Sequence, residues 1–182
     1  DLVGEGVPAD LAGACARLAL GNASRARFLA SEEGAALRAD VDRLVAAALA
    51  GGTRHANEPE PWRGLGGEPK GRDRSAIEKQ FDDAAKRDGR RARTELLDLG
   101  LTLAALRFRD LVCLAEGADD AVLDRAGAAT LATAAPQVAS SDLRAAAERC
   151  EDVRMSLELN VTEDLALEAL GFRLARLVGA PA

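Results

Sequence analysis

Apolar residues recur at helical spacing in two neighbouring stretches between positions 141 and 178. At about 100° per residue, the larger apolar residues of each stretch fall on one face. Asn160, with Glu163 three residues later, has the form of a capping box that starts a helix. The pattern therefore predicts two amphipathic helices in an antiparallel hairpin. The first stripe comprises Leu143, Ala146, Cys150, Val153 and Leu157, and the second comprises Leu167, Leu170, Leu174, Leu177 and Val178.

Some apolar residues of this hairpin lie off both stripes and are mixed with charged residues. Apolar groups on a second helix face are typical either of core for a third helix or of contact surface for another subunit. The sequence leaves both interpretations open. In the second interpretation, the candidate subunit interface consists of Met155, Leu159, Leu165 and Phe172, with Arg173 and Arg176 at its rim.

The longest helical pattern runs from a capping box at Ser75 and Glu78 to about Glu116, and Gly89 is a possible kink within it. Its second half is apolar on two faces, which predicts the centre of a bundle. One face carries Leu96, Leu99, Leu103 and Leu106, and the other carries Leu97, Leu101, Phe108 and Leu111.

Shorter helices are predicted on either side of it. Positions 8–31 form two, interrupted at Gly21, and Ser31 caps a third that ends at Gly51 and Gly52. After Gly117, a further helix is expected over 119–135. Positions 52–74 lack periodicity and concentrate Gly and Pro, so we expect a long flexible loop there.

Composition strengthens the all-α prediction, because Ala and Leu are abundant, aromatic residues make up 3%, and Tyr is absent. Neither a signal peptide nor an apolar run of membrane-spanning length is evident, so we expect a soluble, cytoplasmic protein with no membrane partner. The chain begins at Asp1 without an initiator Met, which leads us to expect a processed or truncated piece.

The sequence contains few residues that could form a catalytic or metal site. The single histidine, His55, cannot build a His-based triad or zinc site by itself, and the three cysteines lie far apart in apolar helical patterns. The Gly-rich run at 64–72 lacks the spacing of a phosphate loop. We therefore expect no active site and no cofactor.

The net charge of −6 is unevenly spread. Between Arg54 and Arg93, 11 Lys and Arg stand against 8 Asp and Glu, which gives this segment +3 and leaves −9 elsewhere. An acidic surface opposes nonspecific nucleic-acid binding. The basic cluster over 86–93 is compatible with a solvated helix face, a protein contact or a weak phosphate contact.

Three motifs carry a resemblance to bacterial DNA polymerase III clamp-loader subunits, and within that family to the δ′ branch. The first is Leu-x-x-Asn-Val-x-x-x-Leu-Ala-Leu-Glu-x-Leu at 157–170, and the second is Arg-Arg-Ala-Arg-Thr at 90–94 followed by a Leu-rich helix and Arg109-Asp110. The third is Gly21 followed by Arg25 and Arg27. Active loader ATPases carry an arginine three residues after that glycine, where this chain has Ser24.

The resemblance implies a non-catalytic region that joins the end of an AAA+ lid domain, at 1–30, to a helical collar domain, at 31–182. Collar domains pack side by side to close the pentameric loader, which places the sliding clamp on primed DNA during replication. The implied partners are the δ and γ/τ subunits. The clamp and primer-template DNA are bound only by the whole complex. Arg25 and Arg27 are possible contacts to a neighbour.

Two other interpretations remain. The chain could be the collar of a γ/τ-type loader subunit, which shares the fold, although Ser24 and the basic run at 90–94 argue against it. It could also be an unrelated helical protein-interaction module.

Overall fold

The computed structural model describes residues 1–51, 76–133, 138–157 and 162–179, and over 76–91 it describes the helix backbone alone. This part of the chain is all-α, as predicted, and contains no strand. Its elements are α1 (Ala9–Leu18), α2 (Ala23–Ala30), α3 (Glu32–Leu49), α4 (Ala76–Ala115), the 3₁₀ helix η1 (Asp119–Ala121), α5 (Arg125–Ala132), α6 (Ser140–Leu157) and α7 (Glu163–Val178).

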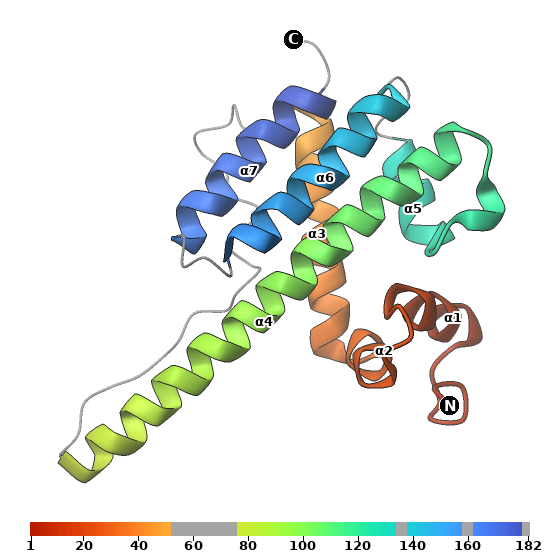
Figure 1. Cartoon of the computed structure of the whole chain (residues 1–182). Helices are drawn as coiled ribbons and strands as arrows, with labels where there is room; N and C mark the ends of the chain where they lie inside the picture. Colours follow the sequence, from red (N-terminus) through yellow and green to blue (C-terminus); the bar gives the residue numbers. More distant parts are fainter. Residues whose placement is uncertain (52–75, 134–137, 158–161, 180–182) are drawn as a thin grey trace.

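Four helices form the body of the molecule. Each of α3, α4, α6 and α7 packs against two of the others, in the closed order α3, α4, α6, α7, and the contact between α4 and α6 is the most extensive. Figure 1 shows α6 antiparallel to both α4 and α7. The hairpin predicted from the two apolar stripes is therefore confirmed, and it is built into a bundle.

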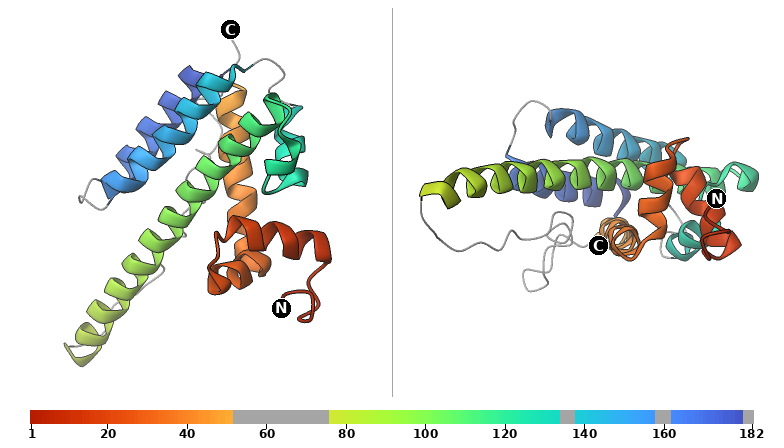
Figure 2. Two further views of the ribbon diagram at one scale, coloured as in Figure 1. Left: turned by 45° about the vertical axis from the view of Figure 1, so that its right-hand side comes forward. Right: turned by 90° about the horizontal axis from the view of Figure 1, so that it is seen from below.

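α4 is the central helix, as its two apolar faces predicted. Leu97, Leu101 and Phe108 are almost completely buried, and Leu99, Leu103 and Leu111 are also buried. The helix continues through Gly89 without interruption, so the possible kink there does not break it. The N-terminal half of α4 extends beyond the other helices of the bundle (Figures 1 and 2).

The two short helices α1 and α2 lie at one end of α3, as Figure 2 shows from two sides. Pro8 is the N-cap of α1, and Gly21, with φ of 87°, makes the turn into α2. Ser31 caps α3 as predicted, because its hydroxyl accepts a hydrogen bond from the Gly34 amide at 3.2 Å. One apolar core continues from α1 through α7.

The single helix expected over 119–135 is wrong. The chain instead forms η1 and an extended turn, and α5 begins only at Arg125, with Asp124 as its N-cap. The fully buried Asp110 of α4 explains the difference, because its carboxylate accepts hydrogen bonds from the Leu123 and Asp124 amides at 2.9 and 3.0 Å. These bonds hold the backbone of the turn away from helical geometry.

The capping box predicted at Asn160 and Glu163 is also wrong. α7 begins at Glu163 with Thr162 at the N-cap, so Glu163 is the first helical residue rather than the third. Several other predictions lie outside the described residues: the cap at Ser75, the loop over 52–74, and the side chain of Leu159. Among the helices whose residues are described, none is both long and apolar enough to cross a membrane.

Candidate subunit interface

The outer face of α7 carries the largest exposed apolar groups of the bundle. Leu165 is 63% exposed and Phe172 is 56% exposed. They are seven residues apart, which is two helical turns, and the exposed Ala169 lies between them on the same face. We call Leu165, Ala169, Phe172 and the exposed Arg176 the outer α7 stripe.

The opposite face of α7 is buried in the bundle. Leu167, Leu170 and Leu174 are at most 3% exposed and pack where α7 meets α3 and α6. A helix that is apolar on both sides is typical of an element with neighbours on both sides. The described residues supply a neighbour on one side only.

Both ends of α7 are fixed to the rest of the bundle. At its start, Arg93 of α4 lies 2.9 Å from Glu163 and 3.2 Å from Asp164, and the Thr94 hydroxyl donates to Glu163 at 3.1 Å. At its end, Gly179 passes close to the chain just after α3, where a Cβ on Gly179 would lie 2.8 Å from the Gly51 Cα. The outer α7 stripe is thus presented by a firmly held helix.

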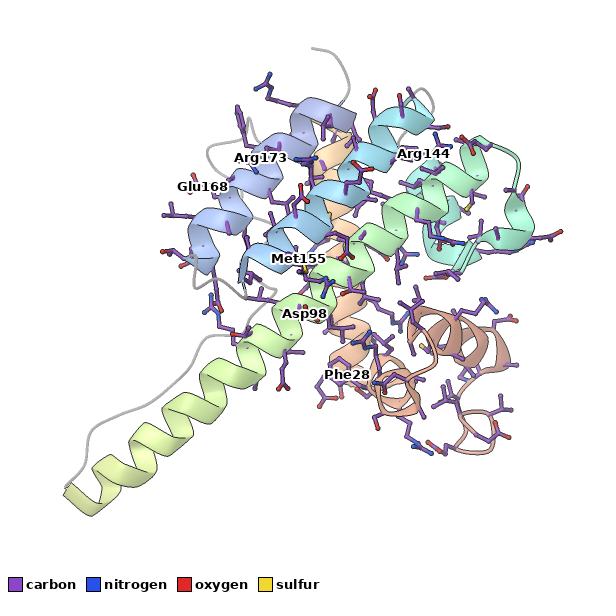
Figure 3. All side chains as sticks on the ribbon, in the orientation of Figure 1. Phe28, Asp98, Arg144, Met155, Glu168 and Arg173 are labelled. Carbon is purple, nitrogen blue, oxygen red and sulfur yellow. The ribbon has the colours of Figure 1, made fainter. Side chains whose placement is uncertain are left out.

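Charged residues flank the stripe. Glu168 and Arg173 are both exposed and lie on opposite flanks, because Glu168 precedes Ala169 and Arg173 follows Phe172. Figure 3 shows both of these side chains on α7. The four α7 residues predicted for an interface, Leu165, Phe172, Arg173 and Arg176, therefore share one exposed surface.

Met155 does not belong to that surface. It is 52% exposed and lies on α6. The neighbouring Arg154 places its guanidinium 4.0 Å from the Met155 sulfur and 3.1 Å from Asp98 of α4, and Figure 3 shows Met155 beside Asp98. The structure thus divides the predicted set between two surfaces.

Arg25 and Arg27 lie on α2, at the other end of the molecule from α7 (Figure 1). Arg27 is exposed and lies 3.3 Å from the Glu5 carboxylate, an ion pair within this chain. Arg25 is half-buried, and its backbone amide donates to the capping Asn22 side chain at 2.9 Å. Ser24 is exposed.

A buried polar cluster joins α3, α4 and α5, and the sequence reasoning missed it. Arg107 of α4 is 4% exposed and donates to Asp42 of α3 at 2.8 Å and to Asp124, the N-cap of α5, at 3.0 Å. Burial raises the pKa of Asp42, although the Arg107 charge acts in the opposite direction. The one available signal was an arginine within the apolar second half of α4.

This cluster cross-links α3, α4 and the start of α5. Each of its charged groups has a partner of opposite charge or an amide donor. Within the described ranges, no group of three His, Cys, Asp or Glu side chains is arranged to hold a metal ion. Burial also raises the pKa of the Cys150 thiol to about 12, which keeps it protonated at neutral pH.

Comparison with known proteins returned no matching family model, no matching curated protein and no matching solved structure.

Proposed function

We propose that this chain is the non-catalytic C-terminal region of a δ′ subunit, and that its bundle is a collar domain that assembles the pentameric clamp loader. The observation that carries an assembly function is the outer α7 stripe, where Leu165 and Phe172 are exposed on a helix whose opposite face is buried. Burying such groups against another subunit is favourable, at about 25 cal/mol per Å² of apolar surface.

The identity of the assembly rests on the sequence motifs. The Leu-x-x-Asn-Val motif begins at the end of α6 and continues into α7, and the Arg-Arg-Ala-Arg-Thr run lies in α4 just before its Leu-rich half. Arg93 of that run forms the ion pair with the start of α7. Two of the three motifs that resemble the loader family therefore lie in α4, α6 and α7, whereas the third, with Gly21, Arg25 and Arg27, lies at α2.

The test mixes this chain with the δ and γ/τ subunits from the same source and measures the molar mass by size-exclusion chromatography with light scattering. We expect a mixed complex that is lost when Leu165 and Phe172 are both changed to Ser. Val3→Ser is the matched control, since Val3 is 54% exposed but lies near the N-terminus. It should leave the complex intact.

The other outcomes decide against parts of the proposal. A complex that survives the double substitution would show that the outer α7 stripe is not the contact. Absence of any complex with δ and γ/τ would contradict the loader assignment and leave a helical interaction module of another kind. A chain that replaces γ/τ in the ring, instead of binding beside it, would belong to the γ/τ type.

A further inference from the structure

The outer α7 stripe has the spacing of a coiled-coil seam. Leu165, Ala169, Phe172 and Arg176 follow one another at intervals of four, three and four residues. This alternation places them at the d, a, d and a positions of a heptad, the positions that face a partner helix. Ala169 leaves room for close approach between two helices, and the exposed Arg176 ends the apolar part of the seam.

The flanking charges indicate which helix fits against this seam. Glu168 occupies the g position and Arg173 the next e position. In a parallel, in-register pair, the g residue of one helix meets the following e residue of the other, so Glu168 of each copy would face Arg173 of its partner. Two reciprocal ion pairs would then border a seam formed by Leu165 and Phe172.

The antiparallel arrangement lacks this complementarity. Each flank of an antiparallel pair meets the same flank of the partner, so Glu168 would find no arginine there. Arg173 would meet the flank that carries Ala166, which is already buried in its own bundle. Charges at e and g positions set the orientation of paired helices. The charges at these positions favour the parallel pair here, and the two Arg176 side chains, which would meet at its a positions, oppose it only at the end of the seam.

We propose that the outer α7 stripe docks a second copy of this chain, with the two α7 helices parallel and in register about a two-fold axis along the seam. The firmly held α7 favours this docking, because little conformational entropy remains to be lost when the second copy binds. The inference uses the same surface as the proposed function but does not depend on the loader assignment. Self-association and binding to other subunits would compete for that surface.

The test is sedimentation equilibrium of this chain alone, from about 1 μM to about 1 mM. The weight-average mass should rise from 19.0 kDa toward twice that value. Glu168→Arg and Arg173→Glu should each move self-association to roughly tenfold higher concentration, because each replaces two favourable ion pairs by two repulsive ones. Glu148→Arg, on the exposed side of α6, is the matched charge reversal and should behave as wild type.

Mixing the two reversed variants provides the decisive readout. Glu168→Arg in one chain then faces Arg173→Glu in the other, and the remaining native residues also face each other, so the mixture should recover wild-type self-association. Circular dichroism of each variant checks that it is folded. A chain that stays monomeric at every concentration, or a dimer that neither reversal weakens, would overturn the proposal. Binding to δ and γ/τ, measured separately, would be untouched by that result.

Discussion

Gly127 of α5 lies directly against the buried Arg107. A Cβ at this position would lie 2.5 Å from Arg107 Nη2 and 2.6 Å from its Cζ. Arg107 cannot move aside without weakening its bonds to Asp42 and Asp124. We therefore expect Gly127→Ala to lower the free energy of unfolding by about 1–3 kcal/mol, as overpacking does in cores.

The matched control for Gly127→Ala is Gly13→Ala, in the interior of α1. There the added Cβ would meet only the end of the Arg17 side chain, at 3.3 Å. Because alanine is the better helix former, this change should raise stability by roughly 0.5–1 kcal/mol. Denaturant unfolding of both variants measures the difference. Equal effects would show that Gly127 has no special contact to preserve.

Asp42 gives the stability of the protein a defined pH dependence. Its pKa is raised in the folded state, first by burial and despite the charge of Arg107, so the folded protein holds this proton to higher pH than the unfolded chain does. Between the unfolded and the folded pKa of Asp42, stability therefore falls as pH rises. Asparagine at this position cannot titrate and lacks this slope.

The comparison of wild type with Asp42→Asn isolates that effect. As pH is lowered from 7 toward 4, the stability of wild type relative to Asp42→Asn should increase. Denaturant unfolding at several pH values measures it. A difference in stability that stays constant with pH, or that moves the other way, would mean that burial does not govern this carboxylate. The groups that face Asp42 are Arg107, Asp124 and Arg38.

Periodicity predicted most of the helices because they bury apolar stripes, but it could not predict the buried polar cluster. Arg107, Asp110 and Asp124 look like surface charges in sequence, since a lone charge off an apolar stripe is normally solvated. Only the folded chain brings Asp110 to the Leu123 and Asp124 amides. These bonds prevent the single helix that was expected over 119–135. The sequence placed Leu165 and Phe172 off the buried stripe of α7, and the structure shows both exposed, whereas their separation from Met155 depends on how α6 and α7 pack in the bundle.

At the scale of elements, the corner between α2 and α3 depends on Gly34. A Cβ there would lie 1.9 Å from the Phe28 carbonyl oxygen and 2.6 Å from the Leu29 Cα, both backbone atoms that cannot move independently. Gly34→Ala should push α2 away from the start of α3. The free energy of local opening of α1 and α2 should then fall by about 2 kcal/mol. Their amide hydrogen exchange should then accelerate roughly thirtyfold.

Ser31→Ala is the matched control at the same corner. It removes the N-cap of α3 and the hydroxyl bond to the Phe28 carbonyl, without a steric clash. Ser31→Ala should lower the stability of this corner by about 1 kcal/mol, less than Gly34→Ala does. Amides in α4 and α6 should keep their protection in both variants. Uniform acceleration across all helices would show instead that this corner opens only when the whole bundle unfolds.

At the scale of the whole molecule, α7 links the folding of the bundle to the assembly proposed for it, and its two faces separate these roles. Leu174 is fully buried and Phe172, two residues away, is 56% exposed. Leu174→Ala removes buried methyl groups and should lower the free energy of unfolding by about 2–5 kcal/mol. Phe172→Ala should change it by less than about 0.5 kcal/mol in the isolated chain, as surface substitutions do.

In assembly, Phe172→Ala should have the larger effect on binding and Leu174→Ala the smaller. At a temperature where both remain folded, Phe172→Ala should weaken the binding of a partner to the outer α7 stripe, whether that partner is a loader subunit or a second copy. Leu174→Ala should leave the stripe intact and bind nearly as wild type. Thermal unfolding and sedimentation of the two proteins measure both properties. If Phe172→Ala destabilised the isolated chain as much as Leu174→Ala, Phe172 would belong to the core of this chain, and the outer face of α7 would have no role left in assembly.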